Sequence, residues 1–116
     1  MKDHVKKLKE IVGDKNAFDK AKDIHPFLED WRGQVKGSTP LILFPIDTEQ
    51  IQKIIQYCSN QNLKIVSQGG NTSLCGAIVP NSSENQIEIV VNTSKMNKVI
   101  EVDPFNQSII VESGCI

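Results

Sequence analysis

The sequence predicts an α+β fold with α/β-like character, in which N-terminal helices precede a small β-α-β-β-β subdomain. Three observations predict it: a helix-periodic segment opens the chain, a second one lies between two short apolar runs, and further apolar runs with a hairpin pattern follow. With 116 residues, of which 39% are hydrophobic and 23% charged, the chain suits one small domain. We divide it into a helical and irregular extension, residues 1–40, and a subdomain, residues 41–116.

The N-terminal extension opens with an amphipathic helix over residues 3–12, which Gly13 ends. Its apolar face carries Val5, Leu8, Ile11 and Val12. Residues 14–40 lack sustained periodicity and contain several prolines and glycines, so we expect one short helix from Phe18 to Ala21, followed by irregular chain.

A strand–helix–strand unit follows. Residues 41–44 form an apolar run that Pro45 closes, and Asp47 stands three residues before Gln50 as in a helix-capping box. The apolar stripe of the predicted helix, expected in the core, consists of Ile51, Ile54, Ile55 and Cys58. Residues 64–67 form the next strand, and two strands joined through a helix favour a parallel pair.

Apolar runs in the last third of the chain predict three more strands. Residues 87–91 are apolar and follow a polar connection at residues 80–86, which we expect to be exposed and mobile. A hairpin then pairs residues 99–102 with residues 108–111, around a type I turn that begins at Asp103.

Composition excludes several classes of function. Thirteen basic and fourteen acidic residues give a net charge of −1 without a basic stripe, so we expect no nucleic-acid partner. Three widely spaced cysteines predict neither a disulfide framework nor a metal site, and His4 and His25 lack partners at ligand spacing. No apolar run approaches the ~20 residues of a membrane span, and no signal peptide is recognised. We therefore expect a cytoplasmic protein, or peripheral attachment at the inner membrane face for the complete enzyme.

The most informative segment follows the strand at residues 64–67. It reads Gln68-Gly69-Gly70-Asn71-Thr72-Ser73-Leu74-Cys75-Gly76. Its glycines let a ligand approach the main chain, and its polar residues add donors, which predicts an anion site without Lys or Arg. No Lys follows the closing glycine as in a P-loop, and the adjacent glycines do not fit the Rossmann fingerprint. A plain connection between two strands is the alternative reading.

Two other residues near this segment allow alternative roles. Cys75 is either a small residue that fits close to a ligand or a reactive thiolate, and the sequence places no His or Arg beside it. Trp31 either anchors the irregular segment or covers a site. Cys58 is expected in the core.

Five motifs in order resemble the FAD-binding domain of the vanillyl-alcohol oxidase and p-cresol methylhydroxylase type. They are Asp30-Trp31-Arg32-Gly33, Pro45 with its capped helix, residues 68–74, Ser94-Lys95-Met96-Asn97 and Glu101-Val102-Asp103-Pro104. Within that family the chain most resembles the FAD-linked D-2-hydroxyacid dehydrogenases, which include D-lactate and D-2-hydroxyglutarate dehydrogenases and the flavin subunit of glycolate oxidase. The resemblance implies that the subdomain is the first part of this FAD-binding fold.

The resemblance also implies the binding residues. The main-chain N–H groups of Gly69, Gly70, Asn71 and Thr72 would cradle the FAD diphosphate. The remaining residues implied at the cofactor are Gln68, Ser73, Leu74, Gly76 and Pro45, with Pro45 near the adenosine. Relatives with covalently attached FAD carry His at the position of Asn71, so the resemblance implies non-covalent FAD.

Two hypotheses of function follow. In the first, the chain is the N-terminal piece of an FAD-dependent oxidoreductase acting on a small D-2-hydroxy acid, with the catalytic residues outside these 116 residues. In the second, it is an inactive fragment or a small partner-binding α/β module that does not bind flavin alone. The sequence leaves open whether uncovered sheet edges lead to self-association or to pairing with a second chain.

Overall fold

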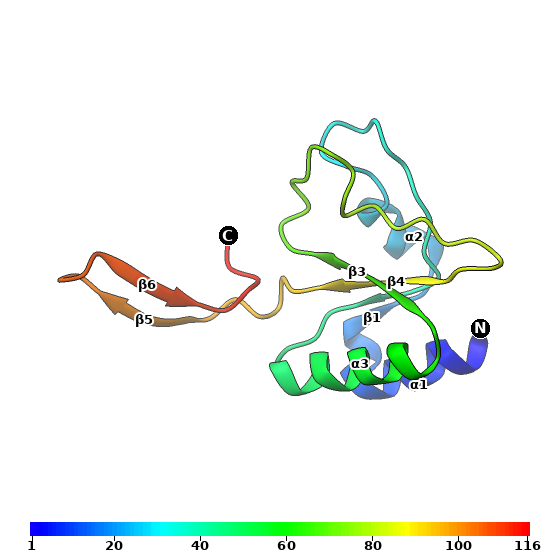
Figure 1. Cartoon of the computed structure of the whole chain (residues 1–116), viewed down its shortest axis with the longest axis horizontal. Coiled ribbons are helices and arrows are strands. Elements are labelled where there is room, and N and C mark those ends of the chain that lie inside the picture. The colour runs from blue at the N-terminus through cyan, green and yellow to red at the C-terminus, as the bar shows by residue number, and fades with distance from the viewer.

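A computed structural model describes all 116 residues of the chain. Its helices are α1 (Lys2–Val12), α2 (Ala21–Ile24) and α3 (Thr48–Asn60), with short 3-10 turns η1 (Asp14–Asn16) and η2 (His25–Phe27). Its strands are β1 (Ala17–Phe18), β2 (Ile42–Leu43), β3 (Lys64–Gln68), β4 (Glu88–Asn92), β5 (Val99–Asp103) and β6 (Ser108–Val111). Helices and strands mix in one α+β body with a separate hairpin, as the sequence predicts (Figure 1).

The main sheet has four strands in the order β1-β2-β4-β3. Strands β2 and β3 both run parallel to β4, and β1 pairs antiparallel with β2. The predicted parallel relation between the two strands around α3 is therefore correct, but they do not pair with each other. Strand β4 lies between them, and its Ile89, Val90 and Val91 are all buried, which is typical of a central strand in a parallel sheet.

The sheet is covered on both faces. Alternate residues of β2 and β4 point to opposite sides, as the period of two requires. On one face, Leu43, Ile89 and Val91 pack against apolar residues of α1 and α3. On the other face, Ile42, Phe44 and Val90 pack against Ile24 and the chain around α2. Figure 1 shows α1 and α3 together on one side and α2 on the other.

The N-terminal region contributes to both cores. Helix α1 ends at Gly13, whose N–H donates to Lys9 O at 2.7 Å. The predicted helix from Phe18 to Ala21 is wrong at its start, because Phe18 belongs to β1 and packs its ring against Phe44 at 4.9 Å. Helix α2 begins only at Ala21. Strand pairing and aromatic packing thus outweigh the local preference at Phe18.

Helix α3 confirms the predicted cap. Asp47 Oδ1 accepts from Gln50 N at 2.8 Å, and Gln50 Oε1 accepts from Ile46 N at 3.0 Å. Ile54 and Cys58 are buried as predicted, whereas Ile55 is 51% exposed and does not belong to the core. Ile55 lies about 100° around the helix from Ile54, at the edge of the buried stripe.

The connection before β4 is exposed at Asn81 and at residues 83–85, as predicted, but differs from the prediction at its start. Pro80 is fully buried rather than exposed, because Ser38 N donates to Pro80 O at 2.8 Å and Ser82 N donates to Ser38 O at 3.0 Å. The residues around Ser38 therefore hold this connection against the body.

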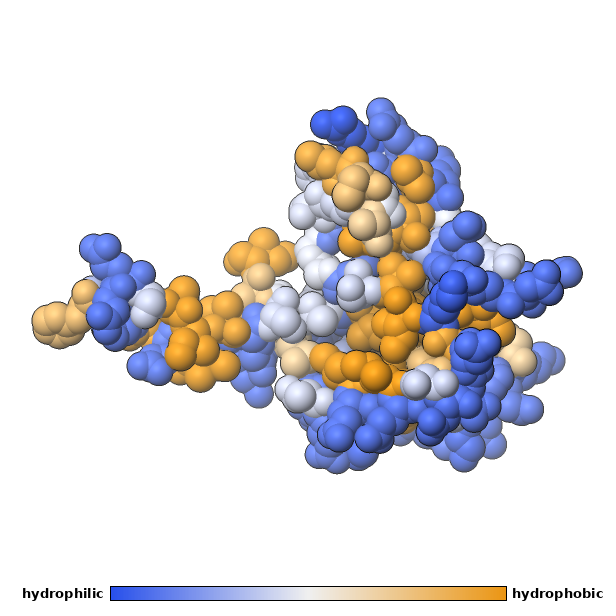
Figure 2. Space-filling model, in the orientation of Figure 1, coloured by the Kyte–Doolittle hydropathy of each residue, from blue (hydrophilic) through white to orange (hydrophobic).

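Strands β5 and β6 form the predicted hairpin, with Asp103 Oδ1 accepting from Phe105 N and Asn106 N. The hairpin projects away from the body, which gives the molecule extents of 53 × 33 × 23 Å (Figure 1). Figure 2 shows apolar side chains along it, separate from those of the body. None of the helices has the length and apolar character needed to cross a membrane.

Candidate functional site

The glycine loop, residues 69–76, leaves the carboxyl end of β3. The ends of β4 and β2 lie at the same edge, because the three strands are parallel. Parallel sheets generally bind ligands beyond this edge. Pro45 follows β2, on the far side of β4 from the glycine loop, and its side chain is fully buried. The structure does not bring Pro45 into contact with the loop.

The main-chain N–H groups of the glycine loop are free. None of the N–H groups from Gly69 to Gly76 donates a hydrogen bond within the chain. Several loop carbonyls, in contrast, accept bonds from neighbouring segments, including Ser73 O from Trp31 N at 3.2 Å and Gly76 O from Val79 N at 3.0 Å. Consecutive unpaired N–H groups of this kind form an anion-binding concavity.

Two side chains of the predicted site hold the loop from inside. Gln68 is 2% exposed, and its Nε2 donates to Phe27 O at 2.9 Å and to Ile78 O at 2.8 Å. Asn71 adopts a φ of 56°, and its Nδ2 donates to Pro26 O at 3.4 Å. The Gln68 side chain therefore lies within the protein rather than on the ligand side of the loop.

The second half of the loop is more exposed. Thr72 and Leu74 face solvent, and Leu74 is 55% exposed. Cys75 is an exposed thiol whose Sγ lies 3.7 Å from Ser73 Oγ, and hydrogen bonding to the Ser73 hydroxyl lowers the pKa of Cys75. Gly76 has a φ of 72°, which favours glycine at this position.

Residues at the end of β4 fix the start of the loop. Thr93 N donates to Gln68 O at 2.9 Å, and Asn92 Nδ2 donates to Gly69 O at 3.4 Å. Asn92 is 1% exposed, and its Oδ1 accepts from Ser94 N. Our reading of the sequence missed Asn92 and Thr93. Their signal is a polar pair directly after a buried strand, at the edge where the glycine loop also begins.

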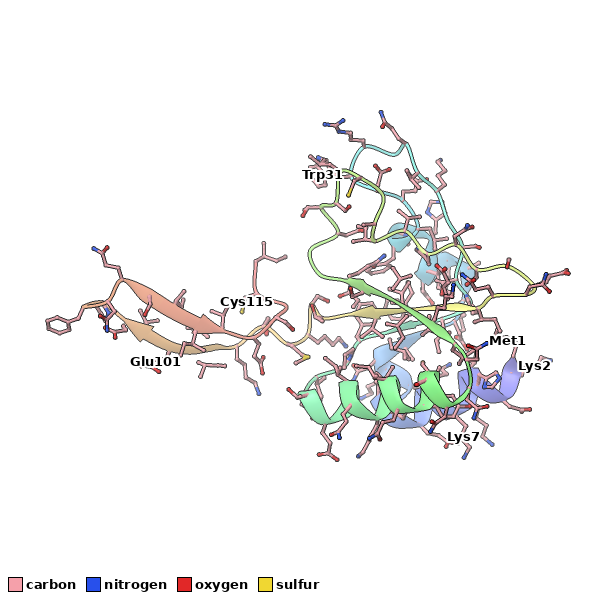
Figure 3. The ribbon with its side chains drawn as sticks, viewed as in Figure 1. Met1, Lys2, Lys7, Trp31, Glu101 and Cys115 are labelled. Carbon is pink, nitrogen blue, oxygen red and sulfur yellow. The ribbon has the colours of Figure 1, made fainter.

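A further element at the loop is the bracing segment, which we define as residues 26–35; the sequence singled out only Asp30 to Gly33 of it, without its contacts to the loop. It supplies the carbonyls of Pro26 and Phe27 and the N–H of Trp31 to the loop. The Trp31 side chain is 69% exposed, at the outer end of the loops above the sheet (Figure 3). Trp31 thus anchors the irregular segment through its N–H group, not through its ring.

Two surface hollows lie elsewhere. One of about 790 Å³ runs along α1 and is lined mostly by charged side chains, including Lys6, Lys9 and Asp19. Another of about 300 Å³ lies around His25 and Pro40. Neither includes a residue of the glycine loop, and Lys9 is already paired with Asp19 at 2.8 Å. No cluster of His, Cys, Asp or Glu could hold a metal ion.

The glycine loop fits the diphosphate of a dinucleotide. A Cβ at Gly69 would meet no atom closer than Thr93 Oγ1 at 4.0 Å, and one at Gly70 would meet only the Ile116 side chain, at 3.4 Å. Space beside these glycines is therefore open to a ligand, with free N–H groups as donors. Main-chain dipoles suit bridging phosphate oxygens without a cationic side chain.

Comparison with known proteins identifies the family of the chain. Residues 39–116 match the model of the family described as FAD binding domain. The chain belongs to this FAD-binding family. FAD is therefore the cofactor of this domain.

Relatives of this FAD-binding domain include a D-2-hydroxyglutarate dehydrogenase and a D-2-hydroxyglutarate–pyruvate transhydrogenase. The domain is 37% identical over 108 residues to a mitochondrial D-2-hydroxyglutarate dehydrogenase of Arabidopsis thaliana, covering 93% of this chain and 19% of that protein. It is 37% identical to a D-2-hydroxyglutarate–pyruvate transhydrogenase of Saccharomyces cerevisiae, covering 81% of this chain and 18% of that protein. The domain thus spans about a fifth of the length of the curated relatives that it matches.

Solved structures share the fold. An alkyldihydroxyacetonephosphate synthase superposes with a TM-score of 0.81 at 26% identity, covering 100% of this chain and 24% of that one. A p-cresol methylhydroxylase superposes with a TM-score of 0.82 at 22% identity, covering 98% of this chain and 22% of that one. The predicted p-cresol methylhydroxylase type of FAD-binding fold is confirmed.

The expected cytoplasmic location is wrong. The relatives from Arabidopsis thaliana, Oryza sativa and Danio rerio are named as mitochondrial enzymes, which points to mitochondria instead. The composition of the chain does not distinguish a mitochondrial from a cytoplasmic location, because folded domains in the two compartments are similar.

Proposed function

We propose that this domain binds FAD non-covalently and that the N–H groups of Gly69, Gly70, Asn71 and Thr72 hold its diphosphate. The observation that carries the proposal is the run of N–H groups from Gly69 to Gly76 without a partner in the chain. Unpaired main-chain donors are costly unless solvent or a ligand satisfies them, so a loop that keeps them open is suited to an anion.

The non-covalent mode is supported by the chemistry of Asn71. A side-chain amide is a poor nucleophile compared with imidazole, and Asn71 Nδ2 is engaged with Pro26 O. Acid precipitation of the FAD-loaded protein tests this mode. We expect all flavin to remain in the supernatant, whereas yellow protein in the pellet would contradict the proposal.

We further propose that the domain serves a flavin-dependent dehydrogenase of a D-2-hydroxy acid, such as D-2-hydroxyglutarate or D-lactate, with glycolate as a smaller candidate. The names of the relatives support the first two substrates. FAD accepts the hydride in such chemistry, and the protein binds and orients it. We expect these 116 residues alone to be inactive, since their loop carries no His, Lys or Arg beside the proposed cofactor position.

FAD titration of the purified chain tests the proposal. A ligand that binds only the folded state stabilises it by about 2.7 kcal/mol at a concentration of 100 Kd, so the midpoint of thermal unfolding should rise by several degrees. Flavin fluorescence should change in parallel. An unchanged midpoint, together with complete removal of FAD on a desalting column, would show that this chain does not bind flavin by itself.

A second candidate function is partner binding, which the exposed hairpin favours. Phe105 is 101% exposed at its tip, and Ile100 and Val102 are 64% and 61% exposed along it. A two-stranded hairpin without a packed face is marginal in water, so a covering partner would stabilise it. Such a partner is a second copy of the chain or another chain. The molar mass of the purified chain in solution tests the first of these.

A further inference from the structure

We propose that Asp30 is a positioning residue for FAD: it shapes the bracing segment that holds the glycine loop with its N–H groups open. This inference rests on the proposed FAD binding through residues 69–72. Asp30 lies outside residues 39–116, the part that matches the FAD-binding family, so the match assigns it no role. Its role follows from its bonds.

Asp30 closes the turn of the bracing segment. It is 5% exposed, and its Oδ1 accepts from Val35 N at 2.8 Å. Its own N–H donates to Val35 O at 3.2 Å, and its carbonyl accepts from Gly33 N at 2.9 Å. Gly33 has a φ of 66°, which gives the chain its reversal. One buried residue thus ties together both ends of the turn.

The turn contacts the glycine loop at two places. Trp31, directly after Asp30, donates its N–H to Ser73 O at 3.2 Å. Val35, at the other end of the turn, packs against Gly76 so closely that a Cβ there would lie 3.0 Å from Val35 Cγ2. Loss of the Asp30 bonds would therefore release both contacts.

These contacts matter because the middle of the glycine loop has few others. Its start is fixed by β4, but from Gly70 to Ser73 the bonds to the rest of the chain are those of Asn71 to Pro26 and of Ser73 to Trp31. Both partners belong to the bracing segment. If that segment becomes mobile, FAD must order the glycine loop on binding. The conformational entropy that the loop then loses lowers the affinity for FAD.

The role requires an acceptor at Oδ1 rather than a negative charge. Asp30 Oδ2 has no hydrogen-bond partner although it is buried. An Asn at this position keeps the acceptor for Val35 N and removes a buried carboxylate from the neighbourhood of a diphosphate. We therefore expect Asp30→Asn to rescue what Asp30→Ala loses.

The experiment compares three variants of the full chain. We expect Asp30→Ala to weaken FAD binding about tenfold, the loss typical of one hydrogen bond to a charged group. Asp30→Asn should bind FAD as the parent does, or more tightly. Glu10→Gln is the control, because Glu10 pairs with Lys7 at the surface of α1, outside the bracing segment and the glycine loop, and its FAD affinity should be unchanged.

A second readout is independent of FAD. In the flavin-free chain, Asp30→Ala should shift and broaden the amide NMR signals of Gly70 to Ser73, while those of Ile54 and Cys58 in α3 stay unchanged. A merely structural role would instead move α3 with the loop. If the parent chain does not bind FAD, the proposed function fails for this chain, and the amide signals alone decide the positioning role.

Three outcomes would overturn the inference. They are unchanged loop amides in Asp30→Ala, unchanged FAD affinity in that variant, or failure of Asp30→Asn to restore it. Should Asp30→Ala not fold, Trp31→Pro carries the same test, because it removes the N–H donor to Ser73 O and loses only an exposed ring. Trp31→Pro with parent affinity for FAD would equally contradict the role of the bracing segment.

Discussion

Gly70 is an exposed residue of the glycine loop whose main-chain N–H has no partner within the chain. Its φ is not in the left-handed region, and a Cβ there would meet only the flexible Ile116 side chain at 3.4 Å. We predict that Gly70→Val folds with a midpoint close to that of the parent but loses FAD binding, since a branched side chain would occupy the place of the diphosphate. FAD titration and thermal unfolding measure the two effects.

Ala77→Val is the control for Gly70→Val. Ala77 is exposed just beyond the loop, and it receives a branched side chain without entering the proposed site. Retained FAD affinity in Gly70→Val would place the diphosphate elsewhere.

Cys75 reports on the same loop through its thiol. Its pKa is lowered by hydrogen bonding to the Ser73 hydroxyl, whereas burial raises the pKa of the Cys58 thiol to about 11. We predict that, in a Cys115→Ser background, maleimide labels Cys75 at neutral pH and leaves Cys58 untouched. Bound FAD should slow the labelling of Cys75 several-fold, which mass spectrometry measures. Equal rates with and without saturating FAD would count against a cofactor on this loop.

At the scale of the element, helix α3 depends on its N-terminal cap. Asp47 Oδ1 satisfies Gln50 N at 2.8 Å, one of the donors that a helix start leaves unpaired. We predict that Asp47→Ala lowers the free energy of unfolding by about 1 kcal/mol, measured by urea titration. Asp47→Asn, which keeps an acceptor at the same place, should lose much less. An Ala variant as stable as the parent would mean that solvent satisfies the helix start equally well.

Helix α1 is joined to the chain after β1 by the Lys9–Asp19 ion pair. Hydrogen bonding to Lys9 lowers the pKa of Asp19 below its ordinary 3.8, and the same bond raises the pKa of Lys9 above 10.5. The pair therefore stabilises the fold fully between these values. Its contribution is lost as pH falls through the lowered pKa of Asp19 or rises through the raised pKa of Lys9.

We predict that Asp19→Asn lowers the free energy of unfolding by about 0.5 kcal/mol at neutral pH, since such partly exposed pairs contribute about 0.2–1 kcal/mol. The difference from the parent should shrink as the pH falls from 3.8 through the lowered pKa of Asp19. Urea titrations at neutral and at low pH measure it. Asp14→Asn is the control, because Asp14 is 90% exposed and 3.9 Å from Lys9, and should have a smaller effect. A difference that persists at low pH would contradict the ion-pair explanation.

At the scale of the whole molecule, the hairpin is the part that the body does not cover. The apolar residues of β5 and β6 lie on both faces of the hairpin, and each of them is at least 40% exposed. The exposed apolar side chains of the hairpin are Val99, Ile100, Val102, Phe105, Ile109, Ile110 and Val111. Figure 2 shows apolar side chains gathered on the half of the hairpin nearer the body and at its tip, with hydrophilic residues between them.

We predict that the chain self-associates through this surface at micromolar to millimolar concentration. Ile100→Lys with Ile110→Lys should shift the molar mass in light scattering towards the monomer, with an unchanged unfolding midpoint of the body. Ile46→Lys is the control, because Ile46 is 45% exposed on the body. A parent chain that stays monomeric throughout the concentration range would show that an uncovered hairpin does not drive association between copies.

Much of this fold could be predicted from local patterns. The ends of α1 and α3, the turn at Asp103 and the glycine loop depend on residue types within a few positions, so the sequence states them directly. Phe18 and Ile55 were predicted wrongly because their state depends on neighbours distant in the chain. The type of element was therefore easier to predict than the surroundings of a given side chain.

The sequence by itself determined the segment that we propose as the cofactor site, because adjacent glycines followed by small polar residues after a strand let a ligand approach the main chain. Only the tertiary structure decided how that segment is held. Gln68 bonds a carbonyl 41 residues earlier and Asn71 one 45 residues earlier, and β4 lies between the strands that flank α3. Contacts over such separations depend on how the whole sheet packs, and no local pattern encodes them.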